Sequence, residues 1–289
     1  MKRIVFEIDG DRLVGDLHLP KGAGPHPALV IVGPMTSVKE QVTGTYAAAL
    51  ATRGFAALSL DHRHFGESEG TPRQYEFYKH KIEDLRAALD VLADQPEVDA
   101  LRIGAVGICL GAGYLAHAIK DRPDVKAFVA IAGYYRDAED IKATAPGDFA
   151  RKFDQGRQSR KRYEAAGVVK MIPAVALDRD AAMTMESTYD YYARRAAHPN
   201  YINEFAVMSR EHFISFDVQS AAPEVAAPFL MVHGSNALNP DWADKFFGAV
   251  RSPKSRASIR SKGQTDIYDD PQIIKRATSL AAGFFDQHL

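Results

Sequence analysis

A sharp, glycine-flanked turn around the single cysteine constrains the fold of this chain more than any other feature. The apolar run 103–106 leads directly into Gly-Ile-Cys-Leu-Gly at positions 107–111, and a helix is expected from about 110 to 120. Glycine is needed at positions 107 and 111, because a side chain at either position would collide with the neighbouring strand or helix. This strand-turn-helix pattern is typical of a nucleophile elbow. It predicts that Cys109 stands at the tip of the turn, in a strained conformation, with its side chain projecting upward.

Strands and helices are expected to alternate around this turn. The chain begins with two β-rich runs that flank Gly10 and predict a hairpin, Lys2 to Asp9 and Leu13 to His18. The alternation that follows is the pattern of a parallel sheet with helices on both faces, joined by right-handed crossovers. The expected strands are 28–32, 56–60, 103–106, 127–132, 228–232 and 257–260, and the other expected helices are 40–53, 75–93 and 271–287.

The alternation breaks between residues 134 and 223, where the sequence becomes polar, helical and rich in charge. A stretch of about ninety residues between two strands of one sheet is too long for a plain crossover. It is interpreted as a helical cap over the carboxyl edge of the sheet, where open α/β folds bind ligands. An oligomerisation arm is the alternative. The predicted organisation is therefore a core of residues 1–133 and 224–289 with a cap inserted at 134–223.

Charge and composition narrow the classes of partner. The formal net charge of the 289-residue chain is -1, so no strong field would gather nucleic acid or an anionic membrane. A small-molecule substrate is the expected partner, and a homodimer is left open. The amino terminus lacks the apolar segment of a secretion signal, and no apolar run reaches the roughly 18 residues of a membrane span, so a cytoplasmic protein is expected. One cysteine allows no internal disulfide and has no metal-ligand spacing around it, so neither metal nor cofactor is expected.

Cys109 is the candidate nucleophile. It would stand at the start of the helix beginning near Leu110, where unpaired N–H groups and the helix dipole favour thiolate over thiol. Sulfur there becomes nucleophilic without as strong a base as serine needs. The alternative is an inert buried residue, which is the usual fate of a free cysteine.

Two further segments carry a resemblance to a known family. Residues 37–41 (SVKEQ) are similar to the loop that supplies an oxyanion donor, and residues 61–70 (DHRHFGESEG) are similar to a D-x-R-x-x-G-x-S-x-G segment. With the elbow, these segments make the chain resemble an α/β hydrolase of the dienelactone hydrolase type, whose members often carry cysteine at the elbow. The resemblance implies the α/β-hydrolase fold, with a mostly parallel central sheet, helices on both faces and a helical cap between the sixth and seventh strands.

The same resemblance implies an oxyanion hole and contacts for substrate. Its donors would be the backbone N–H groups of Leu110 and of Met35 or Thr36, because Pro34 has no N–H to give. Thr36 and the tyrosines that follow the sixth strand, Tyr134 and Tyr135, are expected near the mouth of the pocket. Packing against the cap is the alternative role of the two tyrosines.

The chain departs from the family at the other two triad positions. Ala237 aligns with the expected acid, and Gln264 stands where the family has its histidine. Glutamine cannot take a proton from a thiol, so ordinary triad turnover should be much slower. Three replacements are conceivable: His64 on the loop after the fourth strand, Asp266 two residues beyond Gln264, or a thiolate prepared by the helix end alone.

Three functional hypotheses follow. The first is a hydrolase in which Cys109 attacks an ester, lactone or thioester carbonyl, with an incomplete triad. In the second, a lyase, cyclase or isomerase uses the same pocket without hydrolysis. The third, which Gln264 and Ala237 motivate, is a catalytically silent protein that only binds a ligand.

Overall fold

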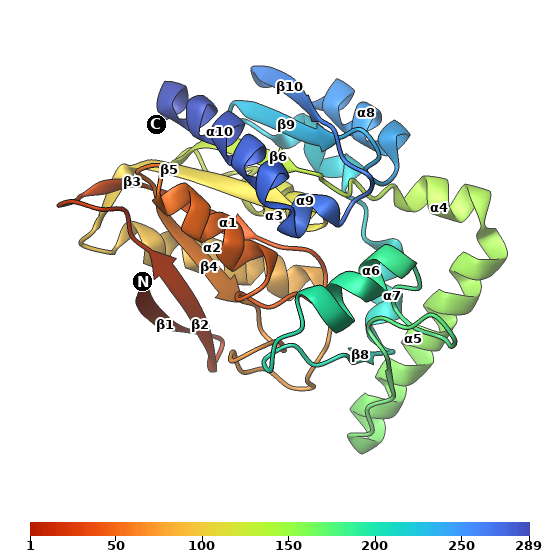
Figure 1. Cartoon of the computed structure of the whole chain (residues 1–289). Coiled ribbons are helices and arrows are strands. Elements are labelled where there is room, and N and C mark those ends of the chain that lie inside the picture. The colour runs from red at the N-terminus through yellow and green to blue at the C-terminus, as the bar shows by residue number, and fades with distance from the viewer.

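An eight-stranded sheet forms the centre of the molecule in the computed structural model, which describes residues 1–289 (Figure 1). The strand order is β1-β2-β4-β3-β5-β6-β9-β10. The first two strands pair antiparallel, and the other six run parallel to one another, which confirms the predicted hairpin and parallel sheet. The strands are β1 (Lys2–Ile8), β2 (Asp11–His18), β3 (His26–Val32), β4 (Ala56–Asp61), β5 (Val98–Ile108), β6 (Val125–Ile131), β9 (Phe229–Gly234) and β10 (Lys254–Ile259).

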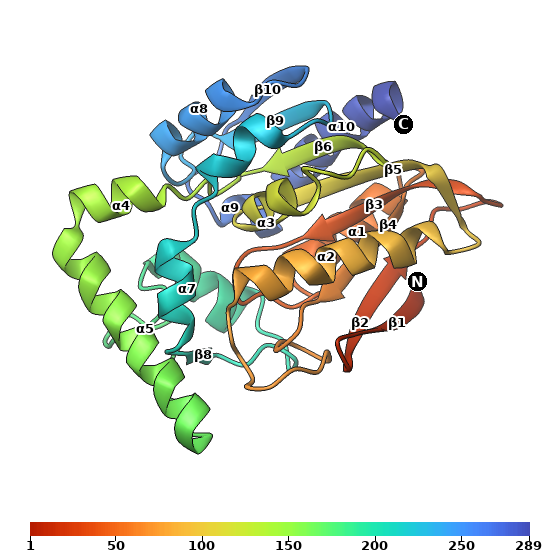
Figure 2. The same cartoon turned by 180° about the vertical axis from the view of Figure 1, so that it is seen from behind.

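Helices cover both faces of the sheet. Helices α1 (Val42–Ala51) and α10 (Pro271–His288) lie on the face seen in Figure 1, and α2 (Tyr78–Ala93) and α3 (Gly111–Ala118) lie on the opposite face, seen in Figure 2. The short helix α9 (Asp266–Asp269) precedes α10, and α8 (Pro240–Ala249) follows β9. None of the helices combines the length and the apolar character needed to cross a membrane.

Helix α10 shows how local sequence specifies these elements. The side chain of Asp270 caps the helix by accepting the N–H groups of Gln272 and Ile273, and Pro271 occupies the first turn, where its missing N–H costs nothing. Buried residues then recur at helical spacing from Ile273 to Phe285. The helix predicted at 271–287 is thereby confirmed.

The turn between β5 and α3 has the expected strained backbone. Cys109 has a φ of 55°, which is uncommon for any residue other than glycine. A Cβ atom at Gly111 would lie 2.4 Å from the carbonyl oxygen of Val32, and one at Gly107 would lie 2.4 Å from the Cα of Ala112. Both glycines are required because strand and helix backbones approach the turn this closely.

We expect Gly111→Ala to lower the stability of the fold by about 1–3 kcal/mol, because the new methyl group meets backbone atoms that cannot rotate away. Urea unfolding followed by circular dichroism measures this change. Gly283→Ala in α10 is the matched control, since nothing lies within 4 Å of a Cβ there and alanine favours a helix. Equal unfolding midpoints for Gly111→Ala and the wild type would contradict the tight approach.

The insertion between β6 and β9 is only partly helical. It contains a two-stranded sheet, β7 with β8, and a π-helical turn, η1, in addition to the expected helices. Its elements are α4 (Ala138–Thr144), α5 (Pro146–Ala166), β7 (Met171–Ile172), α6 (Glu186–Asp190), η1 (Tyr191–Arg195), β8 (Phe205–Ala206), α7 (Ser209–Ser215) and η2 (Gln219–Glu224). The main hydrophobic core is one cluster of 71 buried residues that joins sheet and insertion, since it includes Tyr192 and Phe205 of the insertion.

Candidate active site

A cavity of about 380 Å³ lies at the carboxyl ends of the parallel strands. The loops after five of the six parallel strands contribute to it, and only the loop after β4 does not: Met35 follows β3, Cys109 follows β5, Tyr134 follows β6, Leu238 follows β9 and Gln264 follows β10. Because 16 of its 25 lining residues are hydrophobic, the cavity suits a largely apolar small molecule. The insertion lines it as well, through Met183, Met185, Tyr192, Phe205 and Phe213 among others.

Cys109 lines this cavity but is only 8% exposed. Its backbone is anchored on both sides, because its N–H donates to the carbonyl of Ile131 (3.2 Å) and its carbonyl accepts the N–H of Tyr134 (2.9 Å). Burial raises the pKa of the Cys109 thiol above its ordinary value, although hydrogen bonds from its surroundings, including the Leu110 N–H, act to lower it. The structure therefore opposes the expectation that the helix end alone prepares a thiolate, since burial outweighs that effect.

Two backbone N–H groups can be offered to an oxyanion. The N–H of Met35 makes no hydrogen bond within the protein, the N–H of Leu110 donates to the sulfur of Cys109 and to no backbone acceptor, and both residues line the cavity with Cys109. The N–H of Thr36 is already donated to a carboxylate oxygen of Glu76 (2.9 Å). Of the two alternatives on this loop, the geometry thus favours Met35.

Glu76, which the sequence reasoning missed, holds this loop in place. The carboxylate is buried and accepts a hydrogen bond from the Thr36 N–H. It also accepts a hydrogen bond from the Tyr114 hydroxyl (2.5 Å) and forms an ion pair with Lys81 (2.7 Å). The backbone N–H of Glu76 donates to Ser209 of the insertion (2.9 Å). Glu76 therefore joins the oxyanion loop and helix α3 through its carboxylate, and the insertion through its backbone N–H. The only sequence signal for it is an acid placed among aromatic residues, 75 to 78.

Gln264 and Tyr268 form a short chain of hydrogen bonds beside the sulfur. The carbonyl oxygen of Gln264 accepts the N–H of Leu238 (3.1 Å), and its amide group donates to the Ala132 carbonyl (2.7 Å) and to the Tyr268 hydroxyl (3.2 Å). Hydrogen bonds from Tyr268 and Gln264 act to lower the thiol pKa of Cys109. The structure thus places Gln264 at the predicted site and adds Tyr268, to which the sequence reasoning gave no role.

The other two candidate bases lie elsewhere. His64 contacts His80 of α2, with 2.8 Å between their ring nitrogens, and burial lowers its pKa to about 3. Asp266 uses a carboxylate oxygen to accept the N–H of Lys262 (2.7 Å). Neither residue lines the cavity. His64 and Asp266 are close in sequence to loops of the site, but their side chains make these contacts outside the cavity.

Of the three predicted substrate contacts, one lines the cavity and two do not. Tyr134 lines the cavity, whereas Tyr135 is buried against Phe246, with ring centroids 4.4 Å apart. Thr36 is buried and does not line the cavity, because its loop turns it toward Glu76. Tyr134 and Tyr135 are neighbours in the chain and point to different sides, so only one of them faces the cavity.

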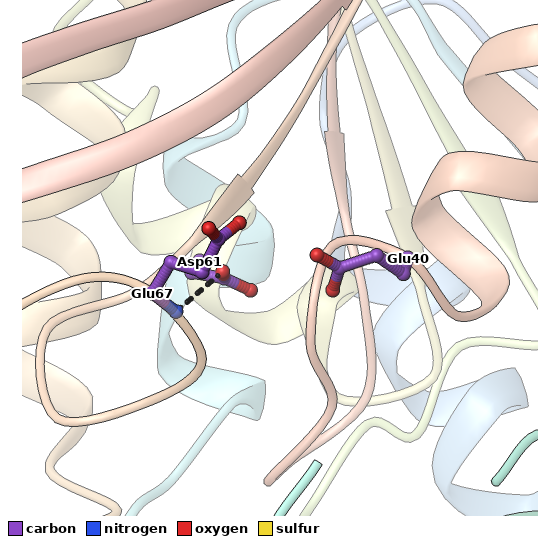
Figure 3. Close-up of side chains that lie close together, drawn as sticks. All are labelled: Glu40, Asp61 and Glu67. Carbon is purple, nitrogen blue, oxygen red and sulfur yellow. Dashed lines mark hydrogen bonds between the residues drawn. The ribbon is translucent and has the colours of Figure 1, made fainter. Parts of the chain in front are cut away.

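A cluster of acidic residues outside the cavity already holds a cation of the chain itself. Figure 3 shows Glu40 facing Asp61 and Glu67, and these carboxylates lie close enough together to hold a metal ion. The ammonium group of the fully buried Lys39 pairs with all three. Burial acts to lower the pKa of Lys39, but hydrogen bonds with Glu40 and Glu67 raise it above its ordinary value. A metal ion would have to displace this ammonium group.

Comparison with known proteins gives a family match over most of the chain. The family described as serine aminopeptidase, S33, matches residues 25–271. The uncharacterised protein PA2218 of Pseudomonas aeruginosa is 31% identical over 97% of this chain and 78% of its own length. The crystal structure of PA2218 aligns with a TM-score of 0.84 and 29% identity, covering 100% of this chain and 93% of that one.

Two enzymes are similar over shorter stretches or at lower identity. The thiohydrolase aneE of Aspergillus aculeatus is 39% identical over 101 residues, which cover 35% of this chain and 31% of that enzyme. Dienelactone hydrolase from Anabaena variabilis aligns with a TM-score of 0.61 and 16% identity, covering 100% of this chain and 97% of that one. At this identity, the likeness to dienelactone hydrolase is one of fold alone.

Proposed function

Because the chain belongs to the serine aminopeptidase S33 family of α/β hydrolases, we propose that it cleaves an ester, lactone or thioester by forming an acyl-enzyme on Cys109. The membership confirms the predicted fold and the prediction of a hydrolase-type enzyme. The observation that carries the proposal is Cys109 at the tip of a strained turn, in a cavity that is also lined by Leu110 and Met35, whose backbone N–H groups have no backbone acceptor. Acyl transfer requires a nucleophile and oxyanion donors of this kind in one cavity.

Acylation would proceed as follows. The sulfur of Cys109 attacks the carbonyl carbon, and the developing oxyanion accepts the N–H groups of Leu110 and Met35, each worth on the order of 10²–10³ in rate. As the bond to the leaving group breaks, the Tyr268 hydroxyl donates its proton to that group and takes the thiol proton. The acyl group is then held as a thioester on the enzyme.

Release of the acyl group is expected to be the slow step. Water must attack the thioester, and Gln264 has no site that can accept the proton of that water. Substrates with good leaving groups are favoured in the first step because they need the least protonation. A thioester meets this requirement best of the three classes, in agreement with the partial match to a thiohydrolase.

The insertion at 134–223 is proposed to act as the cap of this site. Met183, Phe205 and Phe213 belong to it and line the same cavity as Cys109. Apolar side chains from the insertion would exclude water from the thiol and bind the acyl group.

An acyl adduct on Cys109 tests the proposal. The wild-type protein is mixed with 4-nitrophenyl butyrate, and intact-protein mass spectrometry is expected to show one butyryl group per chain. Peptide mapping should locate it at Cys109, and Cys109→Ala should remain unmodified. Absence of an adduct between pH 6 and 10, with the protein folded, would overturn the proposal.

The reactivity of Cys109 is expected to rise with pH well beyond neutrality. The thiolate is the reactive form, and burial raises the thiol pKa, so the rate should increase about tenfold per unit from pH 7 to pH 9. Iodoacetamide labelling followed by mass spectrometry measures this at a single site, since the chain has one cysteine. A rate that levels off below pH 8 would show a stabilised thiolate instead.

A binding protein without turnover is the second candidate. Gln264 favours this function, because its amide oxygen and amide nitrogen already make hydrogen bonds within the protein and the amide group cannot transfer a proton. Thermal stabilisation by a ligand, with neither adduct nor product, would support this function. Turnover retained in Cys109→Ala would instead indicate a lyase, cyclase or isomerase that uses the same cavity.

A further inference from the structure

Arg136, two residues after Tyr134, is a buried cation that makes no ion pair with a carboxylate. Its side chain is 3% exposed, and it lies in no ion pair with any acidic residue of the chain. Its guanidinium group makes one long hydrogen bond of 3.5 Å to the carbonyl of Ile214 and interacts with the hydroxyl of Tyr134, and its Nε atom is buried without a partner. The guanidinium group thus keeps donors that the protein does not use.

The other buried arginines show that this arrangement is exceptional in the chain. Arg63 pairs with Asp84 at 2.6 Å and with two further carboxylates. Arg210 pairs with Asp180 at 2.6 Å. Arg136 instead has its guanidinium carbon 4.1 Å from the ring centroid of Phe213. An aromatic face compensates a buried charge only in part, and a guanidinium group stays protonated even when buried.

Arg136 lines the same cavity as Cys109. The two residues are linked through the backbone, since the N–H of Tyr134 donates to the carbonyl of Cys109 (2.9 Å). Two other cationic residues line the cavity, but Lys152 pairs with Asp148 (2.8 Å) and Arg210 pairs with Asp180. Arg136 is therefore the one cation of the cavity lining that makes no ion pair; Asp217 acts on its charge only from a greater distance.

We propose that Arg136 binds a carboxylate of the substrate, at the end of the acyl chain away from the carbonyl that Cys109 attacks. The substrates would then be half-esters or half-thioesters of dicarboxylic acids with an apolar chain between the two groups. A carboxylate fits because the planar guanidinium fork matches its two oxygens and one negative charge balances one positive charge. This inference rests on the proposed function and adds a substrate class to it.

Two activated esters that differ in one terminal group test the inference. The 4-nitrophenyl half-ester of suberic acid ends in a carboxylate, and 4-nitrophenyl octanoate has the same chain length and ends in a methyl group. The wild-type protein is expected to be acylated by the acidic probe at least about tenfold faster than by the neutral one. In Arg136→Met this ratio should fall to about one, and Arg136→Lys should keep part of it. A wild-type ratio near one would overturn the inference.

Lys152→Met is the matched control, because it removes a paired cation from the lining of the same cavity and should leave the ratio near its wild-type value. Arg136→Met is expected to fold, since replacing an unpaired buried charge with an apolar side chain of similar length removes a desolvation cost. Circular dichroism checks the fold. A ratio that falls equally in both variants would indicate a general field of positive charge and contradict a specific carboxylate site.

A binding measurement separates this inference from the proposed function. In Cys109→Ala, octanoate should raise the melting temperature and octanamide should not, and adding Arg136→Met should abolish the shift. Binding of octanoate through Arg136 in Cys109→Ala, together with no adduct on the wild-type protein, would support the carboxylate site and refute the acyl-enzyme. An adduct on Cys109 that forms equally fast with the acidic and the neutral probe would support the acyl-enzyme and refute the carboxylate site.

Discussion

Gln264→His is expected to raise the turnover of activated esters by on the order of 10²-fold, within the 10²–10⁴-fold range typical of a positioned general base. Gln264 already lies beside Cys109, so an imidazole there can take the thiol proton and later activate the water that releases the acyl group. The Ala132 carbonyl, which now accepts the Gln264 amide, is positioned to accept the N–H of the opposite ring nitrogen. Steady-state release of 4-nitrophenolate measures the gain.

Gln264→Leu is the control, because it fills the same space with a group that cannot carry a proton, and it should not exceed the wild-type rate. Adding Ala237→Asp to Gln264→His should raise the rate again, since an acid that orients the histidine is a large part of a triad. Unchanged turnover in Gln264→His, with a normal adduct on Cys109, would show that proton transfer does not limit the reaction.

Much of the site could be predicted because it depends on local sequence. The turn at Cys109 requires glycines at fixed positions, and the apolar run before it specifies a buried strand. Gln264 was assigned to the site because the family that the chain resembles has its histidine at this position after the last strand, and the structure brings Gln264 beside the sulfur. These inferences needed the order of strands and loops together with the family pattern.

The remaining features depend on contacts between distant parts of the chain. His64 lies on a loop at the correct edge of the sheet, yet His80 from α2 engages its ring. Burial of the Cys109 thiol depends partly on the insertion that lines its cavity, so a helix-end argument alone gave the wrong direction for its pKa. For Arg136 the informative property is the absence of an ion pair, which depends on how every acidic residue of the chain is placed in the fold.

The proposed acyl-enzyme gives a reason for sulfur at the elbow of a site that has glutamine at position 264. We expect Cys109→Ser to lower the rate of acylation by at least about 10²-fold, because a serine hydroxyl depends on a general base far more than a thiol does. The change replaces one atom, so the melting temperature should stay near that of the wild type. The initial burst of 4-nitrophenolate measures acylation in both proteins.

Combining Cys109→Ser with Gln264→His tests whether the two positions act as one unit. If they do, the histidine should raise acylation by serine more than it raises acylation by cysteine, and the two changes should be strongly non-additive. The comparison needs four proteins: wild type, each single variant and the double variant. Equal effects of Gln264→His on serine and cysteine would mean that the residue at 264 does not act on the nucleophile. The slow hydrolysis proposed here would then have to be explained by access of water to the acyl-enzyme.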